Sequence, residues 1–166
     1  MKRVVIASLV TVCAIGVVRA QQSSSAMKEH GGHVVHTPDA MKWGPAPPAL
    51  PPGARSMVLH GDPSKAGETF VVRLQFPDGF KVPPHYHPVA ENVTVLKGTL
   101  LLGLGEKADA ASAKSLTAGS FSYMPKEVRH FAQAKGDTEI QVSGMGPFDV
   151  IYVNPADDPR KKAGSN

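Results

Sequence analysis

The chain has 166 residues, a formal net charge of +4 and a single cysteine, Cys13. One cysteine excludes an intramolecular disulfide framework, and so small a net charge gives no reason to expect nucleic acid or an anionic membrane as a partner. The length suits one domain with a substantial hydrophobic core.

Residues 1–20 have the pattern of a signal peptide. Residues 1–3 are basic, residues 4–18 form an apolar run, and small or modest residues follow where a signal peptidase cleaves. The run is shorter than the roughly 20 residues that a membrane-spanning helix needs. We therefore expect export to a bacterial periplasm or the extracellular space, without stable membrane insertion after cleavage. Removal of this segment leaves a chain that begins at Gln21 and carries a formal charge of +1.

Residues 21–55 are predicted to form a flexible arm rich in histidine and proline. The arm opens on Gln-Gln-Ser-Ser-Ser and ends in a proline-rich run at residues 45–52. His30, His33 and His36 recur at three-residue spacing within it. We interpret them as part of a tail that binds metal weakly at most, and their role stays open.

From residue 56 to residue 154, short segments rich in β-branched and aromatic residues alternate with turns containing glycine or proline. The predicted strands are 57–60, 69–76, 91–97, 99–104, 116–124, 128–134, 139–143 and 148–153. This pattern predicts a single all-β domain, a sandwich or barrel. Residues 105–115 are expected to form a loop, and residues 155–166 a charged C-terminal tail.

The stretch around His85 contains the residues with the clearest chemistry. In an extended strand His85 and His87 lie on the same face, with Tyr86 directed the other way. Pro88 interrupts the strand, and Glu91 begins the next one, so a hairpin could return its carboxylate to the two imidazoles. Two neutral nitrogens and one carboxylate suit a divalent ion such as Mn, Fe, Co, Ni, Cu or Zn.

This spacing resembles the first motif of the cupin superfamily, in particular its small single-domain, metal-binding, RmlC-like members. Five positions fit every interval of that motif: Gly79, His85, His87, Glu91 and Gly98. The resemblance covers about residues 57–153. It implies a cupin-type double-stranded β-helix, which is a jelly-roll barrel, preceded here by an extended N-terminal arm.

The second cupin motif is matched in part. Gly119, Pro125 and His130 stand at its positions, while Glu127 replaces its glycine and Ala134 its asparagine. Alone, His130 would be interpreted as an ordinary core or surface histidine. The resemblance implies instead a four-ligand metal site, which consists of His85, His87, Glu91 and His130.

Strand parity from these ligands, together with nearby aromatic residues, suggests a pocket. Its candidate residues are apolar or aromatic, although plain barrel core is the ordinary role of such residues: Val93, Val95, Val128, Ala132, Tyr123 and Phe131. Such walls suit a hydrophobic small molecule. Glu127 is the one candidate general base, although a carboxylate in a turn is more commonly just solvated.

These features predict one divalent transition metal, Fe, Mn, Ni, Zn or Cu, and a small-molecule substrate or ligand. A metal-dependent oxidoreductase of the dioxygenase type is the leading interpretation. One alternative is a non-catalytic cupin that binds or senses a metal and a small ligand, and another is a metal-dependent isomerase or hydrolase. Cupins often dimerise through edge strands and swapped arms, so a homodimer that uses the arm around Trp43 is also expected.

Overall fold

The computed structural model describes residues 32–162 of the chain. The predicted signal peptide and His30 lie outside this range. The strands are β1 (Gly44–Pro45), β2 (Arg55–His60), β3 (Thr69–Phe76), β4 (Lys81–Tyr86), β5 (Glu91–Leu104), β6 (Lys114–Thr117), β7 (Phe121–Met124), β8 (His130–Met145) and β9 (Ile151–Tyr152). The helical segments are short: η1 (Pro38–Ala40), η2 (Pro155–Asp157) and α1 (Pro159–Lys162). Within residues 32–162 no helix is long and apolar enough to cross a membrane.

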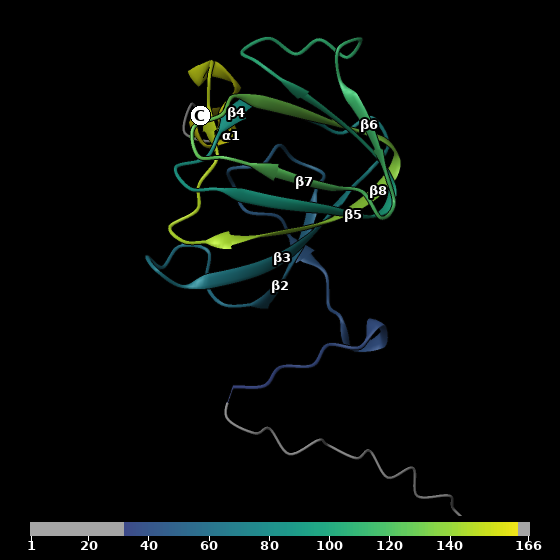
Figure 1. Ribbon diagram of the computed structural model, residues 1–166, viewed down its shortest axis with the longest axis vertical. Coiled ribbons are helices and arrows are strands. Elements are labelled where there is room, and N and C mark those ends of the chain that lie inside the picture. The colour runs from purple at the N-terminus through teal and green to yellow at the C-terminus, as the bar shows by residue number, and fades with distance from the viewer. Residues whose placement is uncertain (1–31, 163–166) are drawn as a thin grey trace, which may run out of the picture. The chain divides into compact units, whose positions relative to one another are not determined.

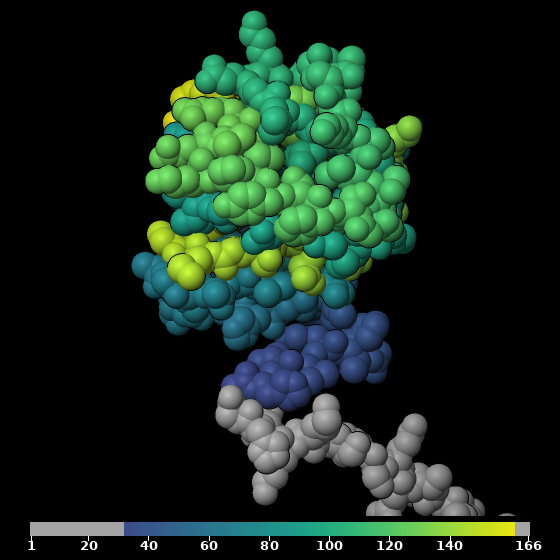
Figure 2. Space-filling model, in the orientation of Figure 1, coloured from purple at the N-terminus to yellow at the C-terminus, as the bar shows by residue number. Residues whose placement is uncertain are grey.

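The strands form one antiparallel, strongly curled sheet (Figure 1). One path runs β1-β2-β3-β8-β4-β9, and β5 pairs with β6, β7 and β8. The longest strand, β8, pairs along one edge with β5 and along the other with β3 and then β4. This arrangement confirms the predicted all-β jelly-roll barrel. In Figure 2 the green atoms of β6, β7 and the segment before β6 cover the upper part of the face turned toward the viewer, and the blue-teal atoms of β2 and β3 lie below them.

Two pairs of predicted strands are each a single strand in the structure. Segments 91–97 and 99–104 are joined in β5, and segments 128–134 and 139–143 are joined in β8. Gly98 does not end the strand, because its φ of 73° allows a register shift between Lys97 and Thr99 while pairing with β8 resumes on either side. Segment 116–124, by contrast, is divided into β6 and β7.

Part of the predicted arm belongs to the barrel core. Ala49 and Ala54 are buried, and the Tyr152 hydroxyl donates a 2.7 Å hydrogen bond to the Ala49 carbonyl. Strand β1 pairs with β2, and Trp43 just before it is half-buried. The proline-rich segment therefore packs on the barrel before residue 56, where the sequence placed the start of the domain.

The core contains large apolar residues and an unusual group of polar ones. Phe70, Val95 and Leu100 are almost fully buried, and Phe76 stacks on Phe80 with ring centroids 4.6 Å apart. The buried polar residues are His85, His87, Glu91, His130, Thr138 and Asp158. Because buried ionisable groups are rare unless they are paired or bind a cation, His85, His87, Glu91 and His130 form a candidate functional centre within the barrel.

Gly98 and Gly136 allow a test of the crossing between β5 and β8. Both have a φ of 73°, but a Cβ at Gly98 would overlap the Asp137 carbonyl oxygen, whereas nothing lies within 4 Å of a Cβ at Gly136. Gly98→Ala should therefore lower the free energy of unfolding by about 3 kcal/mol or more, and Gly136→Ala by about 1 kcal/mol. Chemical denaturation measures both; equal losses would show that only φ matters.

Candidate metal centre

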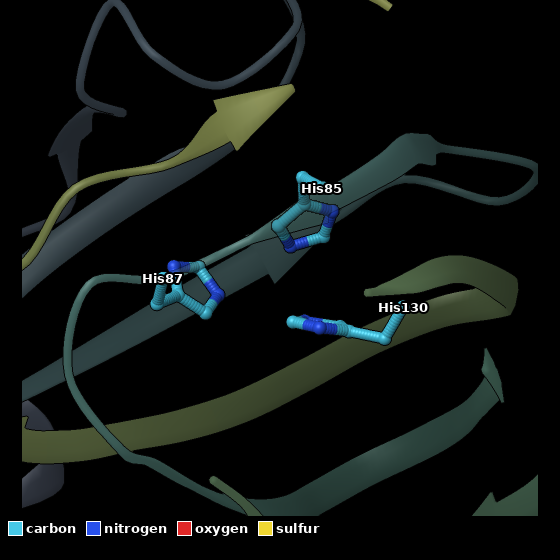
Figure 3. A group of neighbouring side chains, drawn as sticks. All are labelled: His85, His87 and His130. Carbon is cyan, nitrogen blue, oxygen red and sulfur yellow. The ribbon is translucent and has the colours of Figure 1, made fainter. Parts of the chain in front are cut away.

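Four side chains reach one region of the barrel from three strands. His85 lies near the end of β4 and is directly paired with His130, the first residue of β8. His87 follows β4, and Glu91 is the first residue of β5. Figure 3 shows the three imidazole rings directed toward a common space. The structure thus brings together all four residues that the sequence predicted as ligands.

The distances between these groups suit a single ion. One ligand nitrogen from each of His85, His87 and His130 lies within 4.8 Å of the others. The Glu91 Oε2 atom lies 3.5 Å from His87 Nε2 and 3.5 Å from His130 Nε2. Two atoms that each bind one ion at about 2.1 Å are themselves about 3.0 to 3.5 Å apart.

Backbone carbonyls fix the orientation of all three rings. His85 Nδ1 donates to the Pro83 carbonyl at 2.7 Å, His87 Nδ1 to the Asp149 carbonyl at 2.7 Å, and His130 Nδ1 to the Val128 carbonyl at 3.0 Å. A carbonyl only accepts, so each Nδ1 carries the hydrogen. In the neutral rings Nε2 then presents its lone pair to the common space, as metal-binding histidines require.

With its three rings neutral, this arrangement has no positive charge. The Nε2 lone pairs of His87 and His130 then face the Glu91 carboxylate, so acceptors are directed at an acceptor. The Nε2 atom of His87 is buried and has no hydrogen-bond partner. A buried polar atom without a partner costs about 1–3 kcal/mol, and a cation placed between these groups would satisfy all of them. The residues present therefore fit a divalent metal ion.

The pKa of His85 agrees with a neutral ring, and that of Glu91 with an ionised carboxylate. Burial lowers the pKa of His85 to about 3, helped by the neighbouring His130 and His87. Burial alone would raise the pKa of Glu91, but His130 and His87 outweigh it and hold that pKa below its ordinary range. His85 is thus neutral and Glu91 ionised near neutral pH, as ligands of a cation should be.

The residues around His87 support its ring and its backbone. Phe148 stacks on His87 with centroids 4.3 Å apart, while Tyr86 is directed away and lies under Arg129 at 4.7 Å. Glu127 has a φ of 64°, a left-handed conformation that favours glycine, and its N–H donates to the His87 carbonyl at 2.8 Å. The backbone of this turn therefore supports His87, while the Glu127 side chain is exposed.

A cavity of about 390 Å³ opens onto the four residues. Apart from these four, its wall is mostly apolar and includes Val58, Phe70, Val72, Leu74, Val82, Leu102, Ile140, Val142, Phe148 and Val150. Val93 and Ala132, two of the predicted pocket residues, line it. A cavity of this size and character accommodates a small organic molecule.

The lining formed by the described residues does not include the other four predicted pocket residues. Val95 is fully buried in the core, and Tyr123 is 59% exposed. Val128 precedes β8, so the alternation that begins at His130 does not extend to it. Phe131 is paired with Gly103 of β5, and its ring packs against that glycine outside the cavity lining. Glu127 also lies outside the lining, which removes the support for a general base there.

Some residues of the site had no signal in the sequence. Pro47, Ala49 and Leu50 line the cavity although they lie in the predicted arm. Asp149 contributes through its carbonyl oxygen, and any residue type offers that group. His33 and His36 do not join the one candidate metal group found among residues 32–162, and His36 Nε2 instead lies 2.8 Å from the Leu59 carbonyl oxygen.

Residues 33–162 match a family described as a domain of unknown function, DUF4437. The chain belongs to this family and to the cupin superfamily. Two germin-like proteins of Oryza sativa subsp. japonica are similar to this cupin. Germin-like protein 5-1 is 38% identical over 71 residues, or 42% of this chain, and germin-like protein 1-1 is 36% identical over 67 residues, or 40% of it. The cupin spans about a third of the length of these curated relatives, 32% and 31%.

Solved structures support the fold. A putative acetylacetone dioxygenase from Methylibium petroleiphilum matches with a TM-score of 0.59 and 23% identity, over 80% of this chain and 89% of that chain. The polyketide cyclase RemF from Streptomyces resistomycificus matches with a TM-score of 0.56 and 17% identity, over 82% and 92%. An RmlC-like cupin from Shewanella frigidimarina gives 0.52 and 16%, over 66% and 87%. At these identities the likeness shows the barrel and no more.

Without metal, the cupin should lose stability in acid. The pKa of His85 is about 3 in the folded chain and 6.5 as its ordinary value, so between these values the unfolded chain binds more protons. The free energy of unfolding therefore falls as the pH falls from about 6.5 towards 3, and the lowered pKa of Glu91 acts in the same direction.

Chemical denaturation of the metal-free protein at a series of pH values measures this dependence. His85→Asn, which removes the titrating ring, should reduce the slope. A free energy of unfolding that stays constant or rises on acidification would contradict the assigned protonation states.

Proposed function

We propose that this cupin is a metal-dependent oxidoreductase of the dioxygenase type, exported from the cell, that acts on a small organic molecule held in the apolar cavity. One observation carries the proposal. Nitrogens of His85, His87 and His130 and the Glu91 carboxylate come together in the cavity lining, and no lysine or arginine occurs among the described residues that line it.

In this proposal His85, His87, His130 and Glu91 hold one divalent ion, with Fe, Mn, Ni, Zn and Cu as candidates. When bound, such an ion supplies Lewis acidity and, if redox-active, electron transfer with dioxygen. The chain's own contribution is positional. The carbonyls of Pro83, Val128 and Asp149 keep each Nδ1 protonated, and the apolar walls exclude water from the substrate side.

The carboxylates of the cavity favour oxidation over isomerisation or hydrolysis. Asp62 and Asp149 are the two besides Glu91, and both already accept hydrogen bonds, from Ser64 and from Val150 and Arg160. Isomerases and hydrolases commonly use a free acid or base beside the metal. Among the residues that line the cavity, none is placed for that role, so the proposed reaction depends on the ion and its oxidant.

The same observation supports a second candidate, a cupin that binds its metal and ligand without turnover. A binding protein needs the oriented ligands and the apolar cavity but no acid–base group. One fold can carry both enzymes and binding proteins, so the fold does not choose between catalysis and binding. A measurement of turnover by the metal-loaded protein distinguishes the two candidates.

Metal content tests the ligand set. Protein isolated from its native compartment should contain about one transition-metal ion per chain, and His87→Gln should weaken metal binding by at least about 100-fold. His60→Gln is the matched control, because His60 is an exposed histidine of β2 outside the cavity lining. Elemental analysis and competition with a chelator measure both. Equal metal content in the two variants would refute the proposed site.

Oxygen consumption tests the reaction. The metal-loaded cupin should consume oxygen with at least one member of a panel of catechols, flavonols and keto acids, and His87→Gln should abolish the uptake. An oxygen electrode records the rate, and product analysis shows whether both oxygen atoms enter the product. Full occupancy by Fe, Mn or Ni without uptake would favour the binding protein.

Export is part of the proposal and has its own test. N-terminal sequencing of the protein recovered from the periplasm or the culture medium should begin at Gln21, because signal peptidase would cleave after Ala20. An intact Met1 on the mature protein would contradict export through this segment.

A further inference from the structure

The cavity is lined by carboxylates but by no lysine or arginine among the described residues. The only buried carboxylate in this lining is Glu91. The other two carboxylates are not buried, and each accepts hydrogen bonds. Asp62 accepts from the Ser64 N–H and hydroxyl at 2.9 and 2.7 Å, and Asp149 accepts from Arg160 at 2.8 Å.

The proposed metal ion fixes the charge that a ligand should carry. Three neutral histidines, one carboxylate and a divalent ion have a net charge of +1. A ligand with a single negative charge neutralises the site. A dianion would leave a negative charge in an apolar cavity without a basic partner, and a neutral ligand would leave the positive charge uncompensated.

The walls restrict the rest of the ligand. Leu50 from the arm, Val58 from β2 and Phe148 beside His87 present apolar surface to the cavity. Apart from the proposed ligands, the polar side chains in the lining are those of Asp62, Ser64 and Asp149. A polyhydroxylated ligand would therefore bury hydroxyl groups without partners, at a cost for each.

We infer that the ligand of this cavity is a monoanionic oxygen chelator with a mainly apolar body, such as an aryl-substituted keto acid or enolate. The inference rests on the proposed metal site but not on turnover. The two oxygen atoms would bind the proposed ion, and the apolar body would lie against the wall to which Leu50 and Phe148 contribute.

Calorimetry on zinc-loaded cupin tests the inference, since zinc fills the site without redox chemistry. The probes are phenylpyruvate, a monoanion; phenylmalonate, a dianion; methyl phenylpyruvate, which is neutral; and gluconate, a polar monoanion. Phenylpyruvate should bind at least about tenfold more tightly than each of the other three. Binding of phenylmalonate or gluconate as tight as that of phenylpyruvate would overturn the inference.

A charged variant and its control make the test sharper. Leu50→Lys adds a cation to the wall and should shift the preference toward phenylmalonate, whereas Leu50→Met keeps an apolar side chain of similar volume and should preserve the wild-type order. Absence of binding by all four probes to zinc-loaded protein would also overturn the ligand class. Failure to bind zinc would instead refute the proposed metal site, so the two failures can be told apart.

A separate observation concerns the C-terminal tail. Arg160 of α1 forms a two-point ion pair with Asp158, through Nε–Oδ1 and Nη2–Oδ2 distances of 2.9 Å. Its Nη1 donates to Asp149 Oδ1 at 2.8 Å, and Nη2 donates to the Val150 carbonyl at 2.9 Å. The guanidinium thus joins the tail to both the side chain of residue 149 and the backbone of residue 150.

Residues 148 and 149 of the same segment contact His87, a proposed metal ligand. The Asp149 carbonyl accepts the His87 Nδ1 hydrogen at 2.7 Å, and Phe148 stacks on the ring. The geometry assigns Arg160 as a positioning residue for His87: it fixes the backbone at residues 149–150, and that backbone sets the direction of Nε2. The tail, which the sequence suggested was only a charged extension, is then part of the support of the site.

Arg160→Gln tests this role against Arg73→Gln, which removes an arginine paired with Glu139 at 3.5 Å elsewhere on the barrel. Arg160→Gln should raise the zinc dissociation constant about tenfold and change the visible absorption of the cobalt-substituted protein, while Arg73→Gln should do neither. A purely structural role of Arg160 would lower the stability of the metal-free protein without changing the cobalt spectrum. An unchanged spectrum and zinc affinity would overturn the assignment.

Discussion

The structure depends most on the meeting of β4 and β8 at His85 and His130. Their direct pairing places one histidine on each of two adjacent strands, and His87 follows within two residues. Because β8 also pairs with β5, the strand that begins at Glu91 lies on the opposite edge of the same long strand. Four polar side chains inside a barrel core are unfavourable unless something compensates them, and a cation at their centre is the simplest compensation.

Main-chain groups, rather than side chains, give this centre its geometry. Each ring is held by a carbonyl, and the His87 carbonyl is itself held by the N–H of Glu127. The two sequence motifs are therefore linked by a hydrogen bond between backbone groups. This explains how a glutamate can stand where cupins have glycine: the position needs a left-handed backbone and an N–H group, and Glu127 supplies both at some conformational cost.

The sequence predicted the barrel from its strand pattern, and strand parity predicted that His85 and His87 share a face. The resemblance to the cupin motifs implied Glu91 and His130 as further ligands, and the structure places all four side chains in one region. The same parity rule also correctly placed Val93 and Ala132 on the cavity wall. It failed for Val95, which alternation assigned to the cavity but which is buried in the core, and for Val128, which precedes its strand. Alternation predicts a face only within a regular strand, and it cannot say how far the cavity extends along that face.

Other features could not be predicted from local pattern because they arise from contacts between distant segments. A glycine such as Gly98 usually indicates a turn, yet β5 continues to pair with β8 on both sides of it. Arg160 lies in a tail without large apolar residues, and its partners Asp149 and Val150 become its neighbours only after folding. In the same way, nothing in the proline-rich segment indicates that Leu50 faces a cavity.

The position of this proline-rich segment has a broader consequence. It closes one side of the cavity, yet only β1 within it is paired with the sheet. Substitutions at Pro47 or Leu50 can therefore reshape the binding space while the strand ladders stay intact. Under the proposed function, part of the surface that chooses the ligand thus lies ahead of the long strands. Related proteins could then diversify in what they recognise by varying a few residues of this segment.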